Sequence, residues 1–290
     1  WAVIGALAAL GSSFTWAFGT TVYPSLSAKH SPFEVNGSRA LVALLLFFPL
    51  SLWADGAAGW SVVGPSHLSW MFLSMVSSYF LGDACFLWST RALGVPGALA
   101  IASSYPAWTA TAGWLFKDEP LNSQQLVGII LALVGTITVI LSGYRGIRSS
   151  GVAKGYAKGV AFGVLTSGFW ALNSWAVAAG GQGLSPWVGN SIRMSIALIL
   201  CSMASSGLRR KPRVGIPWSS LKPNLGVFAF EAFGGSALYV YGLTHSSLAT
   251  ASVMSSLAPV IAVPLASWRG SEAISTAKGM GVVTAVAGVV

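Results

Sequence analysis

The feature that most restricts this sequence is its division into apolar blocks of about 20 residues, each long enough to cross a hydrocarbon core of roughly 30 Å. Only 8% of the 290 residues are charged, against roughly 25% in an average soluble domain. The sequence therefore predicts an all-α integral membrane protein with ten transmembrane helices. The predicted spans are Ala2–Val22, Pro32–Trp53, Leu68–Arg91, Gly97–Phe116, Ser123–Tyr144, Gly155–Ala179, Pro186–Gly207, Pro223–Thr244, Ala249–Trp268 and Ile274–Val290.

An internal repeat relates the first five spans to the last five. Identical residues recur at an offset of 154 early in each half and of 153 later; among them are Trp16 with Trp170, Asn36 with Asn190, Arg39 with Arg193, Pro106 with Pro259 and Gly128 with Gly281. Because each unit has an odd number of spans, the second unit enters the membrane from the opposite side, as in many secondary transporters. We therefore predict two inverted five-helix repeats, residues 1–145 and 146–290, in one transport domain.

The basic residues predict an orientation. One set of loops carries twelve Lys and Arg residues, whereas the opposite loops carry only Lys117. The positive-inside rule then places loops 143–158 and 207–222 in the cytoplasm and both ends of this chain outside. The net charge of +9 does not indicate nucleic-acid binding, because these residues lie between apolar blocks rather than on an exposed basic face.

Charged residues inside the spans are the first functional candidates, because each costs about 2.5–3.5 kcal/mol to insert. Asp83, with Tyr79 one turn before it, and Glu231 could bind a proton or a substrate amine. Alternatively, they could be structural partners of Arg39 and Arg193. These arginines lie about 10 Å into their spans, from where they reach either the headgroups or an anionic group in a central cavity.

Matched polar and aromatic residues predict where that cavity lies. Ser12, Trp16 and Gly19 correspond to Thr166, Trp170 and Asn173 on one face of the first and sixth spans. For the tryptophans the alternative is ordinary packing. Pro106 and Pro259 interrupt the fourth and ninth spans at equivalent positions, which indicates hinges beside a midplane site. The other residues that we expect around the cavity are Ser103, Ser104, Tyr105, Trp108, Tyr239, Ser255 and Ser256.

The segment from Ala98 to Trp108, the turn Lys117-Asp-Glu-Pro120 and the glycines Gly128 and Gly135 resemble the EamA-type transporters of the drug/metabolite transporter superfamily. The resemblance covers the whole chain and implies transport of a metabolite. Arg39 and Arg193 resemble the family's recurrent arginine. The second copy departs from the pattern at 268–272, where the family has a hydrophobic-Gly-Glu turn. Ten-helix members are usually drawn with both ends inside, opposite to the orientation that the charges predict.

We therefore expect a secondary transporter in the cell membrane, not an enzyme. It would move a small polar, amino-acid-like metabolite by alternating access, coupled to protons or to exchange of a counter-substrate. The alternative is a carrier of a phosphorylated or otherwise anionic metabolite, such as a sugar phosphate or nucleotide conjugate, that Arg39 and Arg193 bind. We expect no cofactor, metal or nucleic acid, but a small-molecule substrate and the lipid bilayer as partners, and a monomer or homodimer.

Overall fold

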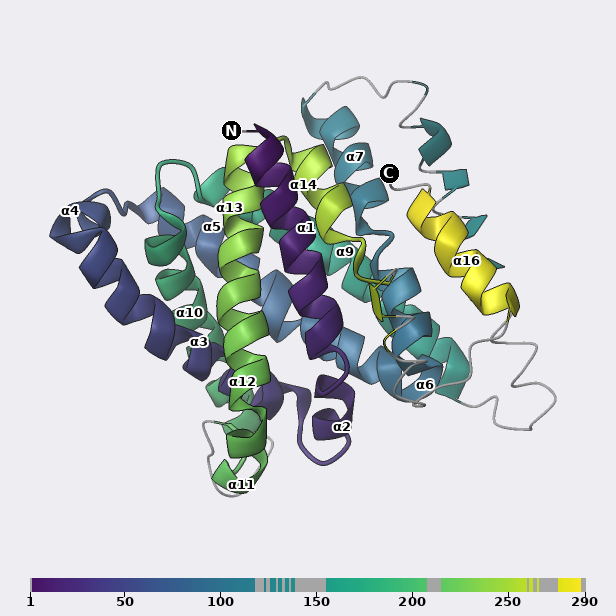
Figure 1. Cartoon of the computed structure of the whole chain (residues 1–290), viewed down its shortest axis with the longest axis horizontal. Helices are drawn as coiled ribbons and strands as arrows, with labels where there is room; N and C mark the ends of the chain where they lie inside the picture. The colour runs from purple at the N-terminus through teal and green to yellow at the C-terminus, as the bar shows by residue number, and fades with distance from the viewer. Residues whose placement is uncertain are drawn as a thin grey trace.

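Helices form every regular element of the computed structural model, within the residues that it describes (Figure 1). Those residues are 2–117, 155–207, 215–259 and 276–287, with short stretches between 123 and 138 and between 261 and 265. The elements are α1 (Ala2–Gly19), α2 (Tyr23–Ser27), α3 (Pro32–Ala54), α4 (Gly56–Ser61), α5 (Pro65–Met75), η1 (Val76–Phe80), α6 (Gly82–Ala102), α7 (Tyr105–Lys117), α9 (Tyr156–Gly180), α10 (Pro186–Gly207), α11 (Trp218–Leu221), η3 (Lys222–Asn224), α12 (Leu225–Phe228), η4 (Ala229–Gly235), α13 (Ser236–His245), α14 (Leu248–Ser255) and α16 (Thr276–Ala287).

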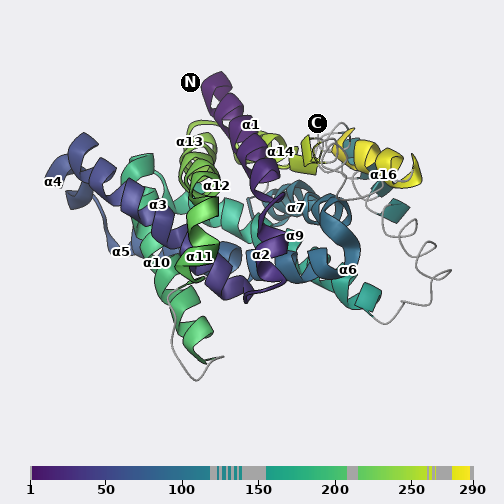
Figure 2. The same ribbon diagram turned by 60° about the horizontal axis from the view of Figure 1, so that its bottom comes forward.

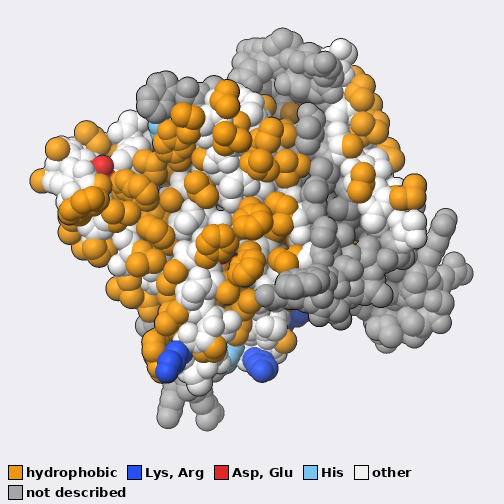
Figure 3. All heavy atoms as spheres, viewed as in Figure 1, with side chains coloured by type: hydrophobic (Ala, Val, Ile, Leu, Met, Phe, Trp, Pro, Cys, Tyr) orange, Lys and Arg blue, Asp and Glu red, His pale blue; other side chains and the backbone are white. Residues whose placement is uncertain are grey.

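Four of these helices are long and apolar enough to cross a membrane, namely Pro32–Ala54, Pro65–Val95, Tyr156–Gly180 and Pro186–Gly207. They match the second, third, sixth and seventh predicted spans. Apolar side chains are spread over the described part of the face in Figure 3, and the Lys and Arg side chains visible there lie along its lower edge. Most of the fifth predicted span lies outside the described residues, as do parts of the ninth and tenth. The described chain is thus that of an integral, multi-pass membrane protein.

Serine and proline set the start of α3, which begins at the predicted Pro32. Ser31 caps this helix: its side chain accepts a hydrogen bond from the Glu34 backbone N–H (3.1 Å), and the Glu34 carboxylate accepts one from the Ser31 N–H (2.9 Å). Pro32 occupies the first turn, where its missing N–H loses no helical bond. This cap fixes the start of the helix that carries Arg39.

Within the described residues, two π-helices interrupt the third and eighth predicted spans at equivalent positions. The first, η1, separates α5 from α6, and the second, η4, separates α12 from α13. An offset of 153 carries residues 76–80 onto 229–233, so the two interruptions share one register. π segments are rare and frequently occur at functional sites. Their matched positions place irregular backbone at the same point of each half.

The fourth and ninth predicted spans are also interrupted, two residues before the predicted hinge prolines. Turns at Ser103–Ser104 and Ser256–Leu257 separate helical segments, and Pro106 then lies in the first turn of α7. The prediction of a break at the proline itself is therefore corrected to a break just before it. The physical reason is that proline fits a helix start, where no backbone N–H is needed, better than a helix interior.

Helices of the two halves pack against one another throughout the molecule. Helix α3 contacts α10, α6 contacts α9, and α1 contacts α13 (Figures 1 and 2). Glycine permits the close approach of α9 to α6, since a Cβ on Gly159 would lie 2.6 Å from the Ala92 Cβ. The Ser89 hydroxyl donates to the Gly159 carbonyl across this contact at 2.8 Å. This interleaving places polar residues of both halves around one central space.

Candidate functional site

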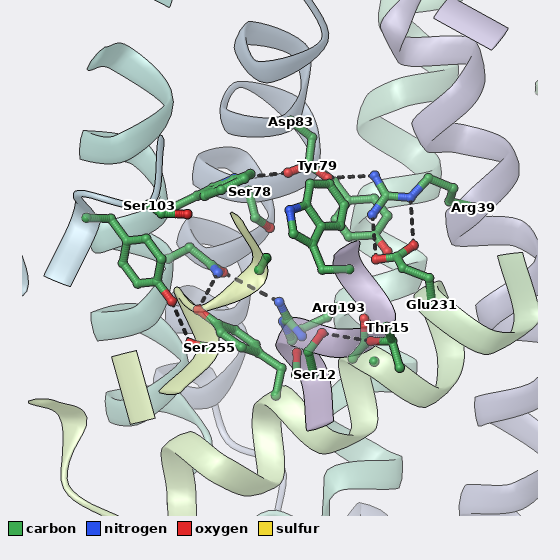
Figure 4. A pocket seen from close by; sticks show the side chains of 18 residues that line it. Ser12, Thr15, Arg39, Ser78, Tyr79, Asp83, Ser103, Arg193, Glu231 and Ser255 are labelled. Atoms are coloured by element: carbon green, nitrogen blue, oxygen red, sulfur yellow. Dashed lines mark hydrogen bonds and ion pairs between the residues drawn. The ribbon is translucent and has the colours of Figure 1, made fainter. Parts of the chain in front are cut away.

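A cavity of about 110 Å³ lies between the helices of the two halves (Figure 4). This volume is several times the roughly 10–15 Å³ that a single water molecule requires. The cavity brings together most of the side chains that the sequence singles out. Those that line it are Ser12, Trp16, Arg39, Tyr79, Asp83, Ser103, Tyr105, Trp170, Asn173, Arg193, Glu231, Tyr239 and Ser255.

Five of the expected residues do not line the cavity, namely Gly19 and Thr166 of the matched face, Ser104, Ser256 and Trp108. The Ser104 hydroxyl donates to the Ile101 carbonyl (2.7 Å), and the Ser256 hydroxyl donates to the Val253 carbonyl (2.8 Å). Each thereby satisfies a carbonyl at an interrupted helix end rather than facing the cavity. Trp108 is 49% exposed, and its indole N–H donates to Ser167 (2.9 Å). The break before α7 sets the phase of this helix, so spacing along the sequence does not predict where Trp108 points.

Arg39 lies at the centre of a buried ion cluster. Its NH1 donates to the Asp83 carboxylate at 2.6 Å, and NH2 and Nε donate to the two Glu231 oxygens at 3.0 and 3.2 Å. The Tyr23 hydroxyl also donates to Glu231. Arg39 itself is only 2% exposed, so it does not extend to the headgroups. Buried charges need such partners, because an unpaired one costs several kcal/mol.

Aromatic rings complete the surroundings of Arg39. The guanidinium carbon lies 4.5 Å from the centre of the Tyr79 ring, 4.6 Å from Tyr23 and 5.1 Å from Trp16. These distances fall within the range of cation–π attraction. The Trp170 indole N–H donates to the free oxygen of Asp83 at 3.0 Å. Most donors and acceptors of this cluster are therefore satisfied within the protein.

Arg193, the repeat partner of Arg39, has neutral partners instead. It is also 2% exposed, and NH1 donates to Asn190 at 2.8 Å, Nε to Ser74 at 3.1 Å and NH2 to Asn173 at 3.4 Å. The Asn173 amide in turn donates to the Tyr239 hydroxyl at 2.9 Å. No carboxylate lies within ion-pair distance of Arg193 among the described residues. This guanidinium thus borders the cavity without a carboxylate in contact with it among the described residues.

The charges around the cavity balance only when both arginines are counted. Asp83 and Glu231 leave one excess negative charge beside Arg39, and Arg193 supplies the single positive charge that cancels it. Figure 4 shows the two arginines projecting from different helices toward the same space. The site therefore has a negative side and a positive side, which suits a polar ligand better than an apolar one.

Several cavity residues escaped the sequence prediction, namely Thr15, Ser78, Gly235, Ser236 and Ala258. Two of them carried a usable signal. At an offset of 153, Ser78 aligns with Glu231, and Ser236 aligns with Asp83. The Ser78 hydroxyl is buried and has no hydrogen-bond partner among the described residues. A buried polar group without a partner calls for an explanation, and a bound ligand is one.

Comparison with known proteins gives one consistent result. The sequence model of the EamA-like transporter family matches residues 3–141 and 157–290. An uncharacterized transporter from Archaeoglobus fulgidus is 23% identical over 256 residues, which cover 88% of this chain and 86% of that protein. A solved crystal structure aligns with a TM-score of 0.68 at 17% identity, over 99% of this chain and 94% of its own. That last similarity concerns the fold alone.

Proposed function

This chain belongs to the EamA-like transporter family, and on that premise we propose that it is a secondary carrier that moves a small polar, amino-acid-like metabolite by alternating access. The observation that carries the proposal is the buried, charged cavity between helices of both halves. Family membership makes the chain a membrane transporter rather than an enzyme. A proton gradient or exchange of a counter-substrate would drive the transport.

Two observations support the inverted-repeat mechanism. The family model matches two separate stretches, each of which falls in one of the proposed repeats, residues 1–145 and 146–290. The π-helices η1 and η4 occupy equivalent positions in these repeats. Interrupted helices at matched positions beside a central site are typical of carriers in which one repeat moves against the other.

The second candidate is a carrier of a phosphorylated or otherwise anionic metabolite. Arg193 favours an anionic group, because no carboxylate neutralises it among the described residues. Arg39 counts against a two-arginine phosphate site, because two carboxylates already bind its guanidinium. A single anionic anchor therefore fits this cavity better than a pair.

The basic loops support an orientation in the cell membrane with residues 143–158 and 207–222 in the cytoplasm. A reporter fused after Val290 should then behave as non-cytoplasmic. A reporter within loop 207–222 provides the matched control and should behave as cytoplasmic. Cytoplasmic signals from both positions would contradict this orientation.

Transport by purified protein in liposomes tests the proposal. A thermal-shift screen against amino acids, sugar phosphates, nucleotides and cationic drugs first selects compounds that stabilise the protein. A labelled form of each selected compound should then enter liposomes preloaded with the same unlabelled compound, faster than into protein-free liposomes. If no stabilising compound exchanges above this background, the carrier proposal is wrong.

A further inference from the structure

The two repeat-related arginines are built alike at their base. In α3, Arg39 NH1 donates to the Asn36 side chain at 2.9 Å; in α10, Arg193 NH1 donates to the Asn190 side chain at 2.8 Å. Each asparagine also donates across to the third or eighth span, Asn36 to the Tyr79 carbonyl and Asn190 to the Ser236 carbonyl. One half can therefore serve as a template for the other.

The two arginines differ in whether carboxylates bind them. Arg39 binds Asp83 from its own half and Glu231 from the other half. At an offset of 153, the residue equivalent to Asp83 is Ser236, and the residue equivalent to Glu231 is Ser78. Both serines line the cavity, as Arg193 does. Two hydroxyl groups thus occupy the positions at which the repeat would place two carboxylates as partners of Arg193.

This exchange leaves donors free to bind a ligand. NH1 and NH2 of Arg193 each use one N–H for a neutral partner, so each retains another N–H without a partner among the described residues. Two N–H groups on one guanidinium can bind a carboxylate through both of its oxygens. The Ser78 hydroxyl, on a side chain only 5% exposed, has no partner among these residues either.

We propose that Arg193, Ser78 and Ser236 bind a carboxylate group of the transported substrate, in the place that Asp83 and Glu231 take around Arg39. This inference rests on the proposed carrier function, because it assigns the cavity's ligand to the transported molecule. With both acids and both arginines counted, the cavity has no net charge, so a single carboxylate beside Arg193 leaves one negative charge there, whereas a phosphate dianion would leave two.

Pairs of small ligands that differ only in the carboxylate test the proposal on the purified wild-type protein. L-Alanine is compared with L-alaninamide, and lactate with lactamide, by thermal shift and calorimetry at constant ionic strength. We expect the carboxylates to bind at least about tenfold more tightly than the amides, as for the loss of a charge-assisted hydrogen bond. Amides that bind equally well, or carboxylates that do not bind at all, overturn the proposal.

Two substitutions at Ser236 locate the site. Ser236→Asp gives the second half an acid at the position of Asp83, so its carboxylate should occupy Arg193 and lower alanine and lactate affinity at least about tenfold. The Asn side chain of Ser236→Asn has nearly the shape of the Asp side chain but no charge, so this variant should retain more of the affinity for alanine and lactate. Ligand-free Ser236→Asp should also melt at a higher temperature than Ser236→Asn. Equal carboxylate affinity in the two variants contradicts the proposal.

Arg193→Gln provides a further variant, in which carboxylate binding should be lost while Arg39 and its acids remain paired. A folded Arg193→Gln protein that still prefers alanine to alaninamide overturns the proposal. If this variant does not fold, the wild-type comparison and the Ser236 pair still decide. Exchange of a stabilising compound without discrimination between carboxylate and amide refutes the carboxylate site alone, whereas absence of exchange refutes the carrier function.

Discussion

Arg39 and Arg193 occupy equivalent helices, are equally buried and bind equivalent asparagines, yet their surroundings differ in charge. Two carboxylates bind Arg39, and the Tyr23 hydroxyl donates to one of them. Three aromatic rings, including that of Tyr23, lie within cation–π distance of its guanidinium. Arg193 has serine, asparagine and the more distant ring of Tyr239 at 6.0 Å. Arg39 pairs with an acid of each half and so stabilises their packing. Arg193 retains N–H groups that can bind a ligand.

The difference teaches that an internal repeat preserves the scaffold more strictly than the charges placed on it. Duplicated helices with duplicated asparagines hold each guanidinium, while a few substitutions decide whether the protein or a ligand neutralises it. The following predictions separate these two roles, in order of decreasing effect.

Replacement of Arg39 by Leu should have the largest effect. It leaves Asp83 and Glu231 buried without their cation, which costs about 3–5 kcal/mol of stability for a broken buried ion pair. Arg193→Leu is the matched control and removes a cation that pairs with no acid among the described residues, so it should cost about 1–3 kcal/mol through lost hydrogen bonds. Unfolding of both variants in detergent micelles measures the difference. Equal losses would mean that the two arginines are not distinct.

Neutralising one acid at a time should have an intermediate effect. Glu231→Gln loses the charge that binds two nitrogens of Arg39 and accepts from Tyr23, and should cost about 1.5–3 kcal/mol. Asp83→Asn should cost less, because Asp83 makes one bond to Arg39 and accepts one from Trp170. The same unfolding measurement ranks the two variants. The reverse order would show that Asp83 is the main partner of Arg39.

Gly19→Ala tests how tightly the Arg39 side is packed. A Cβ at this position would lie 2.7 Å from the Tyr23 ring and 2.9 Å from Glu231 Cγ, so overpacking should cost about 1–3 kcal/mol. In the second half the equivalent position holds Asn173, which borders the cavity. Gly168→Ala, where a Cβ meets nothing within 4 Å, is the control and should not destabilise. An unchanged free energy of unfolding in Gly19→Ala would indicate that Tyr23 and Glu231 can move to make room for the added methyl group.

Tyr239→Phe should have the smallest effect and act on the Arg193 side. It removes the hydroxyl that accepts from Asn173 and pairs with Ser174, at a cost of about 0.5–1.5 kcal/mol. Because Asn173 bonds to Arg193, carboxylate affinity should also fall, which calorimetry detects. Tyr241→Phe in the same helix is the control and should leave affinity unchanged.

Much of the helical framework follows from the sequence, because apolar length and proline punctuation act locally. Helix α10 has the predicted bounds, Pro186 to Gly207, and α3 starts at the predicted Pro32. The structure also places Asp83, Glu231 and both arginines around one cavity, and their binding of a substrate stays a prediction.

Pairing between helices is harder to predict. The sequence left open whether Asp83 and Glu231 bind a ligand or the arginines, since this depends on helix packing across 44 and 192 residues of chain. The composition does not predict the π-helices, because no residue type is specific to them. Trp108 points away from the cavity because the turn at Ser103–Ser104 resets the phase of α7. Among the cavity residues that the sequence prediction missed, Ser78 and Ser236 could have been found, because the offset aligns them with Glu231 and Asp83.

The paired π-helices have a geometric consequence. A π turn holds one residue more than an α turn, so every side chain beyond it is rotated by about 100° relative to a continuous α-helix. Asp83 follows η1, and Ser236 follows η4. The rotation after η1 aligns Asp83 with Arg39, and the rotation after η4 sets the direction of Ser236, which lines the cavity. Removing one residue from η1 would swing Asp83 off its partner without altering any chemical group.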